Sequence, residues 1–177
     1  MIMPGRGDLL LFARLLEYPA ATLPQHLRRL RPADDVGLHK FTAFVEREPL
    51  VRLQELYTTT FDLSPVCCPY VGYHLFGESF KRGALMAKLR ETYAANGFAA
   101  NLTELPDHLS TILYFAAACE DTEFVRELTG DLVVPALRTM VAGFENGQNP
   151  YEDVLRTLLT MLDSQLACAP MGGALDV

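Results

Sequence analysis

Apolar residues recur every three or four positions along most of the chain, and no segment alternates strictly between apolar and polar residues. The first spacing is typical of helices that bury one face, whereas strict alternation would indicate strands. We therefore predict an all-α fold in which residues 1–177 form a single globular helical domain of about eight to ten helices. The residues from about 168 to 177 are rich in Gly and Ala and should form a loose tail.

Prolines mark the predicted helix boundaries in the first half, because proline cannot continue a helix and the residue before it avoids helical angles. Pro19 ends the first predicted helix, and Pro49 precedes another. A further break is expected at Ser64-Pro65 and Cys68-Pro69. The predicted helices of this half cover residues 8–18, a short segment after Thr22, residues 35–47 and residues 50–61.

Capping signals mark the helix that follows. It resumes by about Glu78 and ends at Asn96-Gly97, a pair typical of left-handed helix ends. A loop then leads to Pro106, which suits the first position of the next helix. Asp107 beside it would face the positive end of that helix dipole.

Two further signals lie toward the C-terminus. Gly130-Asp131 is expected to separate a short helix from one that ends near Phe144. Asn149-Pro150-Tyr151-Glu152 resembles a capping box that starts the last helix. The apolar stripe of that helix consists of Val154, Leu155, Leu158, Leu162 and Leu166.

Composition adds an acidic charge to this picture. The chain has 177 residues, half of them hydrophobic, with 15 Lys and Arg against 22 Asp and Glu, which gives a formal net charge of −7. Phosphate contacts dominate nucleic-acid affinity, so an acidic chain is a poor nucleic-acid binder but a reasonable receptor for a basic partner. No apolar run reaches the roughly 20 residues of a membrane span. We expect a cytoplasmic protein without membrane insertion.

The sequence has no recognisable catalytic set. Cys67 and Cys68 are adjacent, so with Cys119 and Cys168 they form neither a Cys-x-x-Cys redox pair nor a zinc knuckle. No nucleophile with its base, phosphate-binding loop or Glu-x-x-His motif of a di-iron bundle occurs. We therefore expect a protein that is not an enzyme and that binds no metal and no cofactor stably.

Residues 57–115 instead combine aromatic, acidic and His residues where a plain helical core would need only Leu and Ala. Packing should claim at least half of the aromatics, because aromatic residues dominate core burial. The remainder, beside Asp62, Glu78 and Asp107, would form an apolar groove rimmed by carboxylates. Such a groove suits an amphipathic or apolar helix with basic residues at one end. The aromatics concerned are Tyr57, Phe61, Tyr70, Tyr73, Phe76 and Tyr93.

Two other hypotheses remain open at this point. A lone His beside an apolar stripe is more often a hydrogen-bonded boundary residue than a ligand or a base. A helical bundle that binds a metal or a small molecule through His74 and His108 is nevertheless a second hypothesis. A helical adaptor whose groove binds an unrelated protein is a third.

Several sequence elements follow one another within about residues 50–120. They are Tyr57 to Leu63, Tyr73-His74-Leu75-Phe76-Gly77, Arg82-Gly83 followed by Met86 and Leu89, Tyr93 with Gly97, and Leu105-Pro106-Asp107-His108-Leu109. In order and spacing this set resembles the cytoplasmic chaperones of molybdoenzyme maturation. The resemblance is strongest to the nitrate reductase assembly chaperone (delta subunit, NarJ) branch of the wider TorD/DmsD group.

The resemblance implies an all-helical chaperone without catalytic activity. Members of the family bind the N-terminal segment of the catalytic subunit of a molybdenum enzyme. They hold the apo subunit open for insertion of molybdopterin guanine dinucleotide and delay export or membrane attachment until then. The implied partner is the apo catalytic subunit of a nitrate reductase or a related dehydrogenase or reductase, and this client carries the cofactor. The chaperone could be a monomer or a dimer.

The resemblance also implies where the client binds. Asp107 and His108 match the Pro-Asp-His element of the family, and Tyr73-His74 matches the element before the Arg-Gly helix. The predicted client-binding residues are Phe61, Asp62, Tyr73, His74, Phe76, Asp107 and His108. Cys67-Cys68-Pro69 and Gly72 replace the more usual polar and aliphatic residues of the family, which leaves the identity of the client open.

Overall fold

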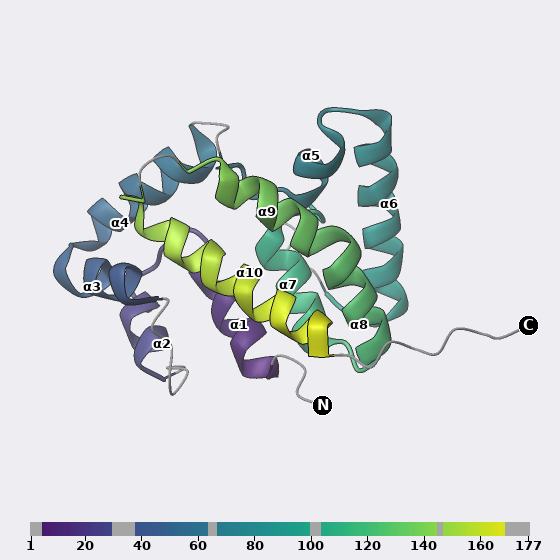
Figure 1. The fold of residues 1–177 in the computed structure, drawn as a ribbon, viewed down its shortest axis with the longest axis horizontal. Coiled ribbons are helices and arrows are strands. Elements are labelled where there is room, and N and C mark those ends of the chain that lie inside the picture. Colours follow the sequence, from purple (N-terminus) through teal and green to yellow (C-terminus); the bar gives the residue numbers. More distant parts are fainter. Residues whose placement is uncertain (1–4, 30–37, 64–66, 100–103, 145–146, 169–177) are drawn as a thin grey trace, which may run out of the picture.

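The computed structural model describes residues 5–29, 38–63, 67–99, 104–144 and 147–168. Within these ranges the regular structure is helical, and the one β-bridge is an isolated pair of residues. The helices are α1 (Arg6–Leu15), α2 (Leu23–Arg29), α3 (His39–Arg47), α4 (Leu50–Tyr57), α5 (Val71–Phe76), α6 (Phe80–Ala95), α7 (Leu109–Ala118), α8 (Thr122–Leu128), α9 (Val134–Ala142) and α10 (Pro150–Cys168) (Figure 1). The prediction of an all-α fold is confirmed.

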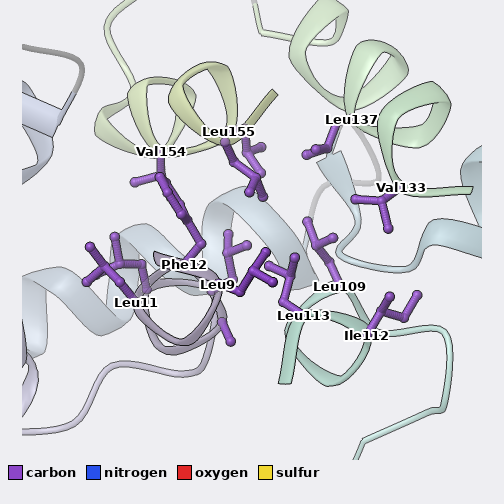
Figure 2. Packing of buried hydrophobic residues seen from close by; sticks show 14 of the residues in the cluster. Leu9, Leu11, Phe12, Leu109, Ile112, Leu113, Val133, Leu137, Val154 and Leu155 are labelled. Carbon is purple, nitrogen blue, oxygen red and sulfur yellow. The ribbon is translucent and has the colours of Figure 1, made fainter. Parts of the chain in front are cut away.

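The core lies where α1, α7, α9 and α10 pack together. Helix α1 runs along α7, and α10 covers this pair from the side that faces the viewer in Figure 1. Figure 2 shows apolar side chains from these helices pointing toward one another. They include Leu9 and Phe12 of α1, Leu109 and Leu113 of α7, Leu137 of α9, and Val154 and Leu155 of α10, all of which are buried.

A second packing centre is aromatic. Phe61 lies at the end of a π-helical segment, Thr58–Asp62, that prolongs α4. Its ring is 4.9 Å from the ring of Tyr57 and 4.8 Å from that of Tyr151, centroid to centroid, and Phe41 meets Tyr151 at 5.0 Å. All four side chains are buried. This cluster fastens α3 and α4 to the start of α10.

Several predicted boundaries agree with the structure. Helix α6 ends at Ala95, and Gly97 adopts the left-handed conformation with a φ of 65°. Asn149 accepts a hydrogen bond through Oδ1 from the backbone N–H of Tyr151, so it caps α10 as predicted. Residues 35–37 of the third predicted helix, the Ser64-Pro65 break and the tail from 169 to 177 lie outside the described residues.

The predicted break at Gly130-Asp131 is wrong. A π-helical segment, Thr129–Val133, joins α8 directly to α9. A Cβ on residue 130 would lie 3.3 Å from Cδ2 of Leu166, tighter than most real contacts. This glycine therefore serves close packing against α10 rather than chain reversal.

Two further differences concern the segment that carries the motifs. Helix α5 was not predicted, and it fills the six residues from Val71 to Phe76. Helix α7 starts at Leu109 with His108 as its N-cap, so Pro106 and Asp107 precede the helix rather than begin it. The cause is tertiary, because backbone hydrogen bonds hold this loop against residues 69–71.

None of the described helices is both long enough and apolar enough to cross a bilayer.

Candidate functional site

An isolated antiparallel bridge brings the two halves of the motif region together. Residues Tyr70 and His108 form the bridge. The backbone N–H of Val71 donates to the carbonyl oxygen of Asp107 at 2.8 Å, and the N–H of Leu109 donates to that of Pro69 at 2.8 Å. The N-terminal ends of α5 and α7 therefore meet, although almost forty residues separate them in the chain.

A buried ion pair fastens α6 to the same point. Arg82, in the first turn of α6, donates from Nε to Oδ2 of Asp107 at 2.8 Å. The Asp107 side chain has no exposed surface, and that of Arg82 is 16% exposed. The guanidinium carbon also lies 5.3 Å from the ring centroid of Tyr70 and 5.9 Å from that of Tyr73, within cation–π range. The hydrogen bond to Asp107 raises the pKa of Arg82, so the guanidinium remains protonated.

The loop before α7 has a second anchor on α6. The buried hydroxyl of Tyr93 donates to the carbonyl oxygen of Pro106 at 2.8 Å. Tyr93 and Arg82 lie three helical turns apart, so they hold Pro106 and Asp107 from two points of one helix. The loop is therefore fixed in position before any partner binds.

Gly72 makes room for this ion pair. A Cβ at this position would lie 2.7 Å from Oδ2 of Asp107 and 3.1 Å from Cγ of Arg82. The first distance is shorter than real Cβ contacts allow. The glycine that departs from the usual family pattern thus allows α5 to pass directly over the Asp107 carboxylate.

His108 is a buried, neutral capping residue. Its Nδ1 accepts a hydrogen bond from the backbone N–H of Ser110 at 3.2 Å and lies 2.7 Å from Oγ of the same residue. Its ring meets that of Tyr70 edge to face at 5.4 Å. Burial lowers the pKa of His108 to about 4, although the negative charge of Asp107 acts in the opposite direction. The neutral ring, accepting at Nδ1, carries its proton on Nε2.

His74 is held by the loop that precedes α5. Its Nε2 lies 2.8 Å from the carbonyl oxygen of Cys68 and 3.6 Å from Sγ of that residue. Burial lowers the pKa of His74 and raises the pKa of the Cys68 thiol, so neither group is activated for chemistry. Within the described ranges, no three His, Cys, Asp or Glu side chains are grouped as a metal site requires.

A cavity of about 550 Å³ opens on the other side of His108. It lies between the C-terminal end of α1 and one face of α7, and residues on both sides of segment 100–103 complete its wall. The lining includes Glu17, Tyr18, Phe98, Glu104, His108 and Tyr114. The site thus combines aromatic surface with two carboxylates and one imidazole.

The predicted site residues occupy different depths. Phe61 and Asp107 are buried, whereas Asp62 and Phe76 are exposed. Tyr73 and Asp107 meet through Arg82, and His108 adjoins them through Tyr70. The prediction that Asp62, Glu78 and Asp107 form the carboxylate rim of an apolar groove is wrong for Asp107. Asp107 is paired beneath the surface, because α5 and α6 cover it.

Sequence reasoning did not find the carboxylates that face the cavity. Glu17 directly follows α1, far from the motif region, and Glu104 precedes the motif loop. No spacing signal links residues 87 positions apart. Only the packing of α1 along α7 places them at one cavity.

Comparison with known proteins first defines the class. The fold matches the crystal structure of a protein from Archaeoglobus fulgidus described as a redox enzyme maturation protein. The TM-score is 0.69 over 92% of this chain and 96% of that one, at 20% sequence identity. At this identity the similarity shows a shared fold.

Sequence similarity then defines the family. Residues 28–156 match the model of the nitrate reductase delta subunit family, and the chain belongs to that family. It is 28% identical to the nitrate reductase molybdenum cofactor assembly chaperone NarJ of Escherichia coli K12, across 90% of this chain and 71% of that protein. It is 33% identical to a Bacillus subtilis protein of the same description, across 72% of this chain and 67% of that protein. These relatives are assembly chaperones rather than catalysts, as expected for a protein that is not an enzyme.

Proposed function

We propose that the chain is an assembly chaperone for the catalytic subunit of a molybdenum-cofactor oxidoreductase. It binds the N-terminal segment of the apo subunit and holds that subunit for insertion of molybdopterin guanine dinucleotide. It acts in the cytoplasm, before the client is exported or attached to the membrane. The cofactor belongs to the client, and the chaperone retains none.

One observation supports a peptide-binding role most strongly. Glu17 and Glu104 line one cavity, and the pKa of Glu104 is raised by burial and further by the negative charges of Asp62 and Glu17. Among the described residues, no Lys or Arg forms an ion pair with any of the three. Like charges without an ion-pair partner favour a basic partner. The neighbouring aromatic surface would suit its apolar residues.

The predicted client-binding residues take two roles in this proposal. Asp62, Tyr73, His74 and Phe76 contact the client, since each is exposed or partly exposed, and His108 contacts it from the wall of the cavity. Phe61 and Asp107 support these residues from beneath, since both are buried. Substitution of Asp62 or His108 should therefore weaken binding directly, whereas substitution of Phe61 or Asp107 should act through stability.

Capture from native cytoplasm tests the function. The tagged chain should co-purify with a molybdoenzyme catalytic subunit that lacks its cofactor. A synthetic peptide covering the first 20 or so residues of that subunit should bind with a Kd of about 1 μM or tighter by calorimetry, which corresponds to about 8 kcal/mol. A scrambled peptide of the same composition is the control. Recovery of the chain alone, carrying stoichiometric metal or an absorbing ligand, would contradict the proposal.

A further inference from the structure

The cavity between α1 and α7 is large enough for part of a peptide. Its volume of about 550 Å³ falls within the range of roughly 300–1,000 Å³ typical of sites that enclose small ligands. A single basic side chain with its own backbone fits this space. Tyr18, with 56% of its surface exposed, stands at the edge of the cavity, and Tyr114 lines it from α7.

Two carboxylates line this cavity, and one cation, Arg14, lies beside Tyr114 in its wall. The two carboxylates are those of Glu17 and Glu104. Burial raises the pKa of Tyr114, and the Glu17 carboxylate raises it further. Burial raises the pKa of Glu104, and the negative charge of Asp62, which does not line the cavity, raises it further. In the described parts of the chain, none of these three carboxylates forms an ion pair with a Lys or Arg.

His108 provides an independent indication of a ligand. The residue is only 2% exposed, yet it belongs to the cavity wall. Its Nδ1 is used by Ser110, and Nε2 has no hydrogen-bond partner among the described residues. Because His108 lines the cavity and Nδ1 is engaged, Nε2 is the ring nitrogen that is left for a ligand there. The Nε2–H group can therefore donate to a carbonyl oxygen that enters the cavity.

We infer that this cavity is the subsite for one Arg or Lys side chain of the client segment. Glu17 and Glu104 are the anionic partners of the cationic head, and the rings of Tyr18 and Tyr114 provide the aromatic surface against which it packs. His108 donates from Nε2 to a backbone carbonyl of the bound segment. This assignment rests on the proposed function and adds the determinant of specificity, which is a positive charge at one position of the client.

Citrulline is the appropriate probe, because it keeps the shape of arginine and removes its charge. The N-terminal client peptide is synthesised with each Arg replaced in turn by citrulline, and each Lys by norleucine. One position should show a loss of affinity of about tenfold to a hundredfold for the wild-type chain, the range expected for hydrogen bonds to charged groups. The other positions should change much less.

Variants of the chaperone assign this loss to the cavity. The double variant Glu17→Gln and Glu104→Gln should bind the unmodified peptide as weakly as the wild type binds the citrulline peptide. It should also no longer distinguish the two peptides. Glu46→Gln is the matched control, since it removes one exposed carboxylate from α3, away from the cavity. This control should retain the full difference between the two peptides.

The outcomes separate the subsite from the function itself. If every neutral replacement binds the wild-type chain as tightly as the unmodified peptide, the subsite is refuted and the chaperone function stands. If no form of the peptide binds the folded wild-type chain, the function is refuted and the subsite with it. The citrulline series uses only the wild-type chain, so it decides the question even if the double variant fails to fold.

Discussion

Arg82 donates a hydrogen bond across 2.8 Å to Asp107, whose side chain has no exposed surface. The pair joins the first turn of α6 to the loop that leads into α7. It lies beneath the surface formed by Tyr70 and Tyr73, whose rings face the guanidinium. The most conspicuous acidic residue of the motif region is therefore a structural anchor, and the surface proposed to contact the client lies above it.

Asp107→Asn should lower the free energy of unfolding by about 3 kcal/mol, because removing one member of a buried pair leaves the other charge without a partner. Urea unfolding followed by circular dichroism measures this loss. Asp163→Asn is the control, because it breaks the exposed pair of Asp163 with Arg138. That change should cost less than about 1 kcal/mol. Equal losses in both variants would show that the Arg82–Asp107 pair contributes no more than a surface pair.

Gly72→Ala should destabilise the chain by about 1–3 kcal/mol, the usual cost of overpacking, since the new methyl group would meet the Asp107 carboxylate. Gly83→Ala should instead stabilise it by about 0.5–1 kcal/mol, because Gly83 lies inside α6 with open space around its Cα. Thermal unfolding of both variants provides the comparison. A neutral Gly72→Ala would mean that α5 can move away from the ion pair at little cost.

Phe61 and Asp62 are adjacent in sequence, but substitutions at the two positions should affect different properties, stability at Phe61 and client binding at Asp62. Phe61→Ala should cost about 3–5 kcal/mol, because it removes a buried ring packed against Tyr57 and Tyr151. Asp62→Asn should change stability by less than about 0.5 kcal/mol, as expected for an exposed position, while it weakens binding of the client peptide. Denaturant unfolding and peptide titration of each variant separate the two effects. Loss of stability in Asp62→Asn would argue against its role as a contact residue.

Stability should fall as the pH is lowered from about 6.5 toward 4, because of His108. In the folded chain burial lowers the pKa of His108 to about 4, whereas the unfolded value is near 6.5. Between these values the unfolded chain binds a proton that the folded chain does not. The free energy of unfolding therefore decreases by up to about 1.4 kcal/mol per pH unit, and the contribution is fully present above pH 6.5.

His108→Asn isolates this effect, since asparagine also caps helices but does not titrate. The difference in unfolding free energy between the wild type and this variant should change with pH in this window and be constant above it. Asp62 and Glu104, whose pKa values burial raises, act in the opposite direction in both proteins and cancel in the difference. A difference that is constant from pH 7.5 to 4.5 would show that His108 titrates normally.

Local sequence signals, such as the apolar period and capping residues, predicted most helices. They did not predict the positions where two helices pack closely together. The period of apolar residues identified the long helices, and Asn96-Gly97 and Asn149 marked helix ends as predicted. Helix α5 was missed because its six residues are too few for the period to show. Gly130 was interpreted as a break, although its lack of a side chain allows Leu166 to approach.

The candidate site was predictable only as a region. The order of the sequence elements indicated the family and predicted His108 as a client-binding residue. The structure places His108 in the wall of the cavity, and its contact with a client stays a prediction. The sequence could not show that Asp107 points inward to Arg82 or that Glu17 lines the same cavity as His108, because both depend on which helices pack together.

The sequence alone determined the all-helical fold and the family, since the helical period and the ordered elements are properties of short segments. The tertiary structure decided which polar groups are paired and which line the cavity. Packing of α5 and α6 buried Asp107 and supplied it with a cation. Packing of α1 along α7 brought Glu17 and Glu104 to one cavity, where neither forms an ion pair with a described Lys or Arg. The free energy of a charge depends on its surroundings, and those form only when the helices come together.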